Sequence, residues 1–419
     1  MAAAFSGIVF LAFYGFGLPV SILSLIWEEL SEKMTVAAAF VGVLRALIAL
    51  GAVISCILSE RIRSRLSSLD LAAAGLSVEA LGVIGISLSR LFWHLCVWVL
   101  VLGAGFGFSL TLLTILVFPE GRKKVEGYFT GTFLGIGTGA LLISSLSGRG
   151  LSWRTICQAI GIVQICLVVV IFFLRRMALK RTSFPEALRK WRRGEEIRRL
   201  NARREIALSG EDSGTDYIGM YLRRVTVSCA AAALSALILL GLSLWPESYR
   251  VLSGFRGGSL PREILAVTSG GALGCLLWRF LPGDTRTLYA SSTLLLLGCL
   301  IIEQVFLGAG MLTGNLIYLF AFLGGAAEGP IFPALILIDD VRLDRDAELA
   351  LTGLIPAFYL GSWVLVTPLG QALVGGEAES LFALWLLLLA MLLALCLFYL
   401  SDEGRGKRKK RERQNSKRA

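Results

Sequence analysis

The sequence contains few charged residues for its length. Only 17% of its 419 residues are Asp, Glu, Lys or Arg, whereas 56% are hydrophobic. A water-soluble domain usually carries about 25% charged residues. The shortage excludes an ordinary soluble protein with a single core and indicates a polytopic membrane protein.

Several kinds of catalytic and cofactor site are also missing. His94 is the only histidine, which excludes a multi-histidine metal centre. The 8 cysteines lie in apolar stretches without a Cys-x-x-Cys pattern, so neither disulfides nor a cysteine-ligated metal is expected. The Walker A, His-Glu-x-x-His and Gly-x-Ser-x-Gly patterns do not occur either. We therefore expect no enzyme, no catalytic residues, no metal and no other cofactor.

Long apolar stretches are abundant instead. A helix needs about 20 mostly apolar residues to cross the hydrocarbon core of a bilayer. The stretches that qualify are roughly 5–27, 36–58, 69–88, 92–117, 126–147, 155–174, 222–245, 262–281, 286–306, 311–338, 350–374 and 380–400. They are apolar on all sides, as expected for helices buried in lipid or in each other. The sequence therefore predicts an all-α membrane protein with 12 transmembrane helices, the first of them a retained span.

The distribution of Lys and Arg predicts the orientation. The net charge is +11, and nearly all basic residues fall in alternate loops, including 59–70, 119–125 and 175–221, and in the C-terminal tail. Basic residues in short loops remain in the cytoplasm. We expect both termini to be cytoplasmic in an inner or plasma membrane. The basic tail should contact anionic lipid, and no nucleic-acid partner is expected.

The longest interruption, 175–221, divides the chain into two halves of six spans each. It contains a helix-start pattern at Ser183–Glu186, followed by apolar residues at helical spacing among basic ones, which predicts an amphipathic helix on the inner membrane surface. The expected regions are a six-helix bundle at 1–174, a basic linker at 175–221, a second six-helix bundle at 222–400 and a cytoplasmic tail at 401–419.

The two halves resemble each other. Leu102-Gly103, Ile115-Leu116 and Thr130-Gly131 align with Leu323-Gly324, Ile336-Leu337 and Thr352-Gly353, at an offset near 221 residues. Two pseudo-symmetric six-helix bundles related by an axis along the membrane normal are the plan of a major facilitator transporter.

One loop carries a recognisable motif. The major facilitator superfamily has G-x-L-A-D-R-x-G-R-K between spans 2 and 3, and residues 56–65 occupy that loop here. Glu60, Arg61 and Arg65 match the motif, while both of its glycines are replaced. The chain resembles this superfamily over essentially its whole length. The resemblance implies a cytoplasmic charge-relay gate at these three residues, although the arginines would also serve topology alone.

Further segments are similar to one branch of the superfamily, the sugar permeases related to the fucose–proton symporter. They are Gly17-Leu18-Pro19 with Trp27, Phe133–Gly137, Trp153-Arg154 and Gly329–Pro333. Members of this branch carry an acid early in span 1 and another in span 4. Here Leu18–Ser21 and Gly105–Ser109 occupy those places without a carboxylate, so the proton-handling residues of the branch cannot be carried over.

Ionisable residues within spans are candidate functional residues, because a charge near the bilayer centre is costly. Arg45 in span 2 and Glu79 in span 3 lie at similar depth on consecutive spans. They are expected either to form an interhelical ion pair or to serve substrate or proton binding. Glu303, with Gln304 beside it in span 9, lies near the outer end of its helix, where a side chain can also reach the interface.

Glu328 stands in the middle of span 10, beside Pro330 and Pro333. Prolines within a span remove backbone hydrogen bonds and kink the helix, which is tolerated where helices line a cavity. We expect Glu328 to be the principal coupling or substrate-contacting acid. The alternative is a structural Glu that hydrogen-bonds a neighbouring helix.

Three aromatic residues complete the candidate set: Tyr14 in span 1, and Tyr359 and Trp363 in span 11. Resemblance to the superfamily implies that these spans line a central cavity. Sugars stack on such rings and lipophilic cations bind them, although each ring also suits simple packing.

The function that these observations favour is secondary active transport of a small polar organic solute, sugar-like, by alternating access. A proton is the favoured coupling ion, and a monomer is expected. Two alternatives stay open: efflux of lipophilic or cationic compounds, and a non-transporting sensor or scaffold with the same fold.

Overall fold

The fold is that of a computed structural model of the 419-residue chain. The structure describes residues 2–36, 40–63, 68–117, 122–180, 260–281, 285–308, 311, 314–337 and 356–357. Regular secondary structure in these ranges is α-helical throughout, which confirms the all-α expectation. The expected spans 222–245 and 380–400, most of 350–374, nearly all of the linker with its amphipathic helix, and the tail lie outside the described residues.

The described helices are α1 (Ala2–Gly17), α2 (Ile22–Met34), α3 (Phe40–Arg63), α4 (Ser68–Leu88), α5 (Phe92–Val117), α6 (Arg122–Gly148), α7 (Trp153–Lys180), α10 (Leu260–Trp278), α11 (Thr285–Gly308), α12 (Gly314–Glu328) and α13 (Ile331–Leu337). Within the described residues, 7 helical stretches are long and apolar enough to cross a membrane, and α11 contains a shorter apolar stretch, Thr287–Glu303. The protein is a multi-pass membrane protein.

The first expected span, 5–27, consists of two helices rather than one. α1 and α2 are separated by turns at Leu18–Ser21. Pro19 explains this break, because its ring leaves no backbone N–H and disfavours helical conformation in the preceding residue. The apolar stretch also continues further than expected, over Phe5–Met34, until Thr35 ends α2 in the left-handed conformation at φ 52°.

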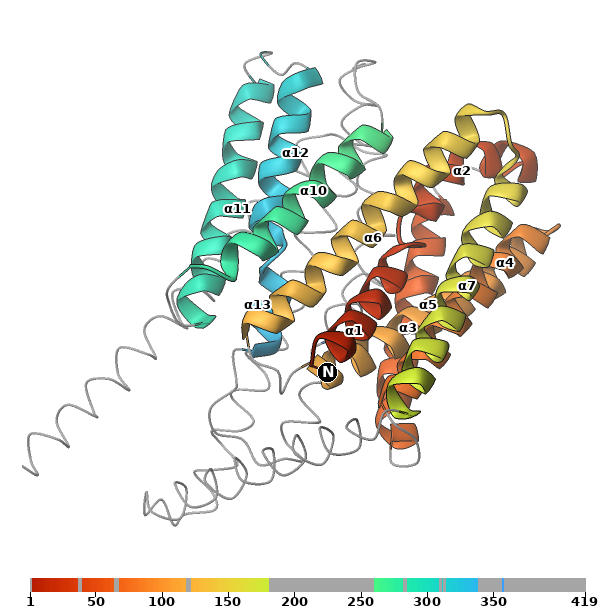
Figure 1. Ribbon diagram of the computed structural model, residues 1–419. Coiled ribbons are helices and arrows are strands. Elements are labelled where there is room, and N and C mark those ends of the chain that lie inside the picture. The colour runs from red at the N-terminus through yellow and green to blue at the C-terminus, as the bar shows by residue number, and fades with distance from the viewer. Residues whose placement is uncertain are drawn as a thin grey trace, which may run out of the picture.

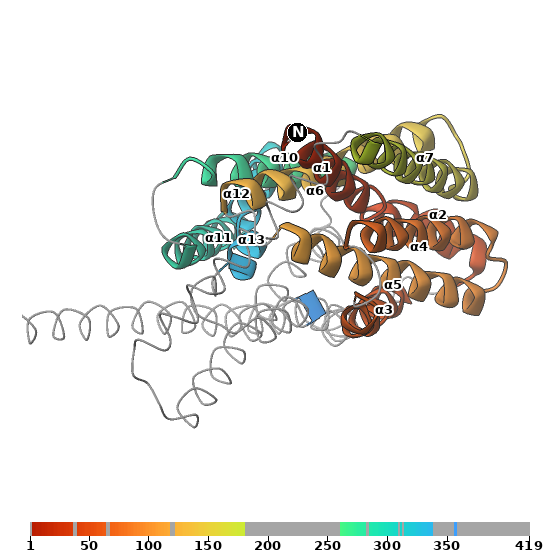
Figure 2. The ribbon, with the colours of Figure 1, turned by 60° about the horizontal axis from the view of Figure 1, so that its bottom comes forward.

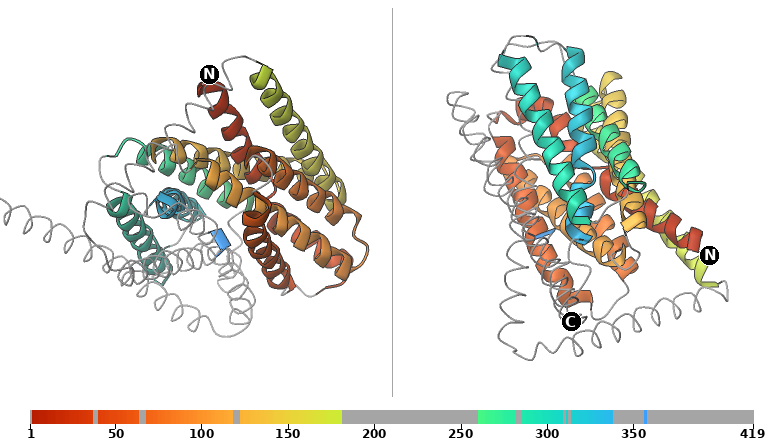
Figure 3. Two further views of the ribbon diagram at one scale, coloured as in Figure 1. Left: turned by 90° about the horizontal axis from the view of Figure 1, so that it is seen from below. Right: turned by 90° about the vertical axis from the view of Figure 1, so that its left-hand side faces the viewer.

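The helices form two groups that meet along one helix pair. α1–α7 make up the first group and α10–α13 the second (Figure 1). α6 of the first group packs along α10 of the second (Figure 2), and the view from below shows this pair between the other helices of the two groups (Figure 3). α13 also contacts α6, at the end of the molecule that carries the N-terminus.

Apolar packing joins the two groups at that same end. One buried cluster combines Val9, Leu76 and Leu113 of the first group with Tyr289 and Leu335 of the second. A second buried cluster, towards the opposite end, draws on the first group alone. The end that carries the N-terminus is therefore where the described parts of the two groups share a core.

The α3–α5 pair and the α10–α12 pair are packed in the same way. In both pairs, glycines bring one helix backbone against carbonyl oxygens of the other. The contacts are Gly51 with Leu100, Gly103 with Ile48 and Gly107 with Ala52 in the first pair, and Gly270 with Phe322, Gly325 with Val267 and Gly329 with Gly271 in the second. A β-carbon at any of these glycines would overlap the facing oxygen or come within its contact distance. Small residues of this kind are typical of close helix pairs in membranes.

These contacts give the internal repeat an exact register. An offset of 219 residues relates the α3 positions to those of α10, and an offset of 222 relates α5 to α12. Gly103 therefore corresponds to Gly325, and the alignment that paired it with Gly324 was wrong by one residue. Adjacent glycines look alike in a sequence, but they point about 100° apart around a helix, and only one of them meets the neighbouring helix.

Candidate functional site

The helix of the expected tenth span is interrupted directly after its acidic residue. α12 ends at Glu328, and a turn at Gly329 and Pro330 leads into α13. Pro330 has no backbone N–H, so the carbonyl of Ala326 loses its helical donor. Pro333 likewise removes the helical donor of the Gly329 carbonyl.

Both of these carbonyl groups face α10. Gly274 lies directly against the Ala326 oxygen, and the thiol of Cys275 donates a hydrogen bond of 3.1 Å to the Gly329 oxygen. A buried carbonyl without a donor costs free energy, and within a membrane neighbouring helices commonly supply the missing partner. α10 therefore stabilises the break beside Glu328.

Glu328 keeps part of its surface exposed, although Ala327, Gly329 and Pro330 around it are buried. No hydrogen bond or ion pair joins its carboxylate to the described residues. The Cys275 thiol is close enough to interact electrostatically with Glu328 and also with Glu126 of α6. Carboxylates from both helix groups thus lie around one thiol, where the groups meet.

Aromatic rings cross the boundary between the groups nearby. Phe129 of α6 meets Phe13 of α1 edge to face at 4.9 Å between ring centroids, and it meets Phe332 of α13 in the same way at 5.5 Å. Tyr128 also stacks on Phe13, at 5.9 Å between ring centroids. These contacts close the boundary with apolar surface at the end that carries the N-terminus.

A second polar centre lies wholly inside the first group. Glu79 of α4, Ser109 of α5 and Gln164 of α7 each have 0% of their surface exposed. The Gln164 side-chain amide donates to Glu79 Oε2 at 2.7 Å and to the Gly15 carbonyl of α1 at 3.4 Å. Four helices therefore contribute polar groups to one buried point.

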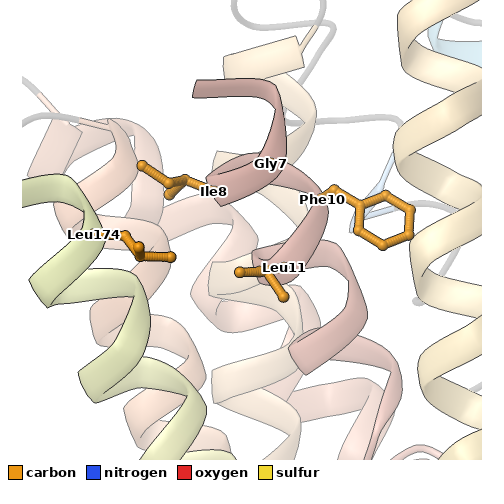
Figure 4. Close-up of a pocket in the computed structure, with 5 residues that line it drawn as sticks. All are labelled: Gly7, Ile8, Phe10, Leu11 and Leu174. Atoms are coloured by element: carbon orange, nitrogen blue, oxygen red, sulfur yellow. The ribbon is translucent and has the colours of Figure 1, made fainter. Parts of the chain in front are cut away.

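The surface also has an apolar groove of about 400 Å³ between α1 and α7, lined by Gly7, Ile8, Phe10, Leu11 and Leu174. Ile8 and Leu11 of α1 lie on the side of Leu174 of α7, whereas the Phe10 ring points the other way (Figure 4). None of the expected site residues lines this groove, and it presents no charged side chain. It does not suit a polar solute.

Comparisons with known proteins identify the fold. No protein-family model matches the sequence, and no curated protein matches it either. The structure is similar to the major facilitator proton:xylose symporter XylE bound to 6-bromo-6-deoxy-D-glucose, with a TM-score of 0.72 at 14% identity over 95% of each chain. It is also similar to the human organic anion transporter MFSD10, with a TM-score of 0.68 at 15% identity over 94% of this chain and 99% of that one. The chain has the major facilitator fold.

A major facilitator fold accounts for the two equivalent helix pairs, because its halves are related by an axis along the membrane normal. The thiol hydrogen bonds repeat as well. Cys56 of α3 donates to the Gly107 carbonyl at 3.5 Å, as Cys275 does to Gly329 at 3.1 Å. At the α5 position that corresponds to Glu328, the first half has Phe106, so the acid belongs to one half only.

Within the major facilitator fold, the expected Arg45–Glu79 ion pair does not form. Arg45 donates to Ser24 at 3.2 Å, whereas Glu79 is bound by Gln164. The reason is that α3 and α4, although consecutive in the chain, are not neighbours, because α5 packs between them (Figure 2). Similar depth on consecutive helices is therefore not enough to predict a contact.

The other predicted site residues are placed only in part. Tyr14 is half-buried on α1, and Glu303 is half-buried on α11 beside a second carboxylate, Glu263 of α10. Glu60 and Arg61 belong to the last turns of α3. The side chains of Glu60, Arg61 and Gln304, and the whole of Arg65, Tyr359 and Trp363, lie outside the described part of the chain.

Sequence reasoning missed several residues of both centres. Glu126 is the first residue of the expected span 126–147 and was not singled out, yet only 2% of it is exposed. Gln164 was not singled out either, although a lone amide within a strongly apolar stretch is a usable signal. Nothing in the local sequence marks Cys275 as part of the site, because its role depends on the Gly329 carbonyl, 54 residues away in the sequence.

Proposed function

We propose that this protein is a secondary transporter that moves a small polar organic solute, sugar-like, by alternating access with proton coupling. The fold supports transport as a class, and one similar structure is that of a proton:xylose symporter. Alternating access in this fold consists largely of one half rocking against the other around a site near the midplane. The residues in that site are candidates for solute and proton binding.

The observation that carries the proposal is the position of Glu328. Its carboxylate is partly exposed at the break between α12 and α13, beside the helix pair along which the halves meet. The corresponding position of the first half has no acid. A membrane-embedded acid is a functional candidate by default. A carboxylate beside the boundary between the halves is well placed to become accessible from each side of the membrane in turn as the halves rock.

Given the orientation expected from the basic loops, the contacts between the described parts of the halves favour one conformational state. If the N-terminus is cytoplasmic, the Phe129–Phe332 contact and the shared apolar core lie on the cytoplasmic side. The structure would then represent a state closed towards the cytoplasm. Import or export both pass through such a state, so the direction of transport has to be measured.

The test is uptake by purified protein in proteoliposomes, with sugars, organic anions and lipophilic cations tried in parallel, with and without a pH gradient. Organic anions belong in the panel because MFSD10, a similar structure, is an organic anion transporter. Accumulation of a sugar-like solute that depends on the pH gradient is the expected result. Accumulation of lipophilic cations alone would favour efflux, and no movement of any solute would favour a sensor or scaffold.

A further inference from the structure

We propose that Glu79 and Gln164 form a buried proton-binding site inside the first helix group, separate from Glu328. The bound species is a proton on the Glu79 carboxyl group. The proposal concerns the folded chain itself, so it holds or fails independently of the transport proposal.

The site is sealed from solvent on every side. Glu79 of α4 is fully buried, and α1, α5 and α7 all contact α4. The groups that face the carboxyl from these three helices are the Gly15 carbonyl, Ser109 and Gln164. Gly105 of α5 closes the remaining side, because even a β-carbon at this position would overlap the backbone and side chain of Glu79.

No cation balances a charge on this carboxyl. Among the described residues, no Lys, Arg or His forms an ion pair with Glu79 or faces it from α1, α5 or α7. Arg45 is separated from it by α5. An isolated ionised carboxylate in an apolar interior is very costly, and such a group takes up a proton instead. The geometry thus calls for a neutral carboxyl group in this conformation.

The surrounding groups can serve both protonation states. Oε1 of Glu79 and Oγ of Ser109 are buried and have no hydrogen-bond partner of their own. A hydroxyl group both donates and accepts, so Ser109 can accept from the protonated acid or donate to the ionised one. The Gln164 amide donates to Oε2 in either state. A site that accommodates both forms can release its proton as well as hold it.

Gln164 also connects this site to the break in the first span. Pro19 deprives the Gly15 carbonyl of its helical donor, and that oxygen accepts instead from Leu18 N at 3.3 Å and from Gln164 at 3.4 Å. One side-chain amide therefore joins the Glu79 carboxyl to the end of α1. Loss of the proton would strengthen the hydrogen bond from the Gln164 amide to Oε2 of Glu79. It would thereby alter the hydrogen bond from the same amide to the Gly15 carbonyl.

Infrared spectroscopy of the purified full-length protein in lipid nanodiscs tests the proposal, because the C=O stretch of a protonated carboxyl is resolved from the carboxylate bands. We expect a carboxylic acid band near neutral pH that Glu79→Gln removes. Glu32→Gln, which changes an exposed acid of α2, is the matched control and should leave that band in place. A carboxylic acid absorption in Glu79→Gln that is unchanged from that of the parent protein, or no such band in the parent protein, would overturn the proposal.

Two further measurements keep the test decisive if Glu79→Gln does not fold. Gln164→Leu and Ser109→Ala each strip a hydrogen-bonding group from the carboxyl without removing it, so each should shift the frequency of the band. If neither variant shifts it, the band does not come from Glu79 and the proposal fails. Disappearance of the parent band on exchange of choline for sodium would show that the site holds a sodium ion instead.

Discussion

At the scale of single residues, prolines within spans free backbone carbonyls, and side chains from neighbouring helices take over as donors. Pro19 leaves the Gly15 oxygen to Gln164, and Pro333 leaves the Gly329 oxygen to Cys275. In both places an acid lies beside the new donor: Glu79 contacts Gln164, and Glu328 is an electrostatic neighbour of Cys275. The two centres therefore share one physical plan, although they lie in different halves.

Glu328→Gln tests whether this acid couples solute to protons. Glutamine keeps the size and hydrogen-bonding capacity of the side chain but cannot exchange a proton. We expect solute accumulation driven by a pH gradient to fall to simple equilibration in proteoliposomes, while exchange of solute across the membrane persists. Glu32→Gln, which changes an exposed acid of α2, is the control and should accumulate solute like the parent protein. Full accumulation by Glu328→Gln would make Glu328 structural.

Cys275→Ala should destabilise the protein more than Cys56→Ala does. Both thiols are almost fully buried, at 0% and 1% exposure, so the two substitutions remove the same volume from similar surroundings. The Gly329 oxygen loses its remaining donor in Cys275→Ala, whereas the Gly107 oxygen keeps its helical donor because α5 is uninterrupted. We expect the difference to be about 1 kcal/mol in the free energy of unfolding.

Thermal unfolding of the purified variants in detergent measures this difference. Cys275→Ser restores a donor and should recover most of the loss. Equal destabilisation by the two alanine variants would mean that the thiol hydrogen bond contributes nothing to the helix break.

At the scale of helices, close backbone contact determines which helix lies beside which. α3 and α4 follow each other in the chain, yet both pack on α5 through glycines, which keeps Arg45 away from Glu79. The equivalent α10–α12 pair places Cys275 and Gly274 against the break at Glu328. The repeated pair is therefore both a packing unit and the support of a candidate site.

Gly51→Ala and Gly270→Ala should have similar effects, because the two positions are equivalent in the repeat. Each new methyl group would overlap a carbonyl oxygen of the partner helix, and overpacking of this kind costs about 1–3 kcal/mol. The control is Gly298→Ala in α11, where nothing lies within 4 Å of the added carbon. Folded yield and melting temperature should fall for the first two variants and not for the control. A marked difference between Gly51→Ala and Gly270→Ala would argue against equivalent pairs.

At the scale of the whole molecule, α6 occupies the central position. It packs on α1 within its own half and on α10 and α13 across the boundary. Glu126, Phe129 and Phe133 of α6 all face the second half: Phe129 meets Phe332, Phe133 packs on Gly271, and Glu126 neighbours Cys275. A rocking motion between the halves has to change these contacts.

The orientation of the molecule can be tested on α6 alone. Lys123 and Ser147 are both exposed and lie at opposite ends of this helix. With the N-terminus in the cytoplasm, a cysteine introduced at Ser147 should react with an impermeant maleimide added to intact cells. One introduced at Lys123 should react only after the cells are permeabilised. The reverse pattern would refute the orientation derived from the basic loops. The parent protein is the control for labelling of the native cysteines.

The sequence by itself determined the class of molecule. Long runs of apolar residues have few folded solutions in a membrane, because every backbone polar group must be satisfied internally. The helical class, most helix positions and the major facilitator resemblance followed from that constraint and from short local motifs such as Gly329–Pro333. The breaks followed in part, since Pro330 marks one of them, while the break at Pro19 inside the first span was not foreseen.

Only the tertiary structure decided which polar groups meet. Glu79 binds Gln164, 85 residues further along the chain, and Cys275 binds Gly329, 54 residues away. The sequence of a helix that is apolar on all sides does not indicate which helix packs against it. Similar depth in the membrane and adjacent positions in the chain therefore suggested Arg45 as the partner of Glu79. The neighbour is decided instead by where glycines allow two backbones to touch, and that depends on the shapes of both helices at once.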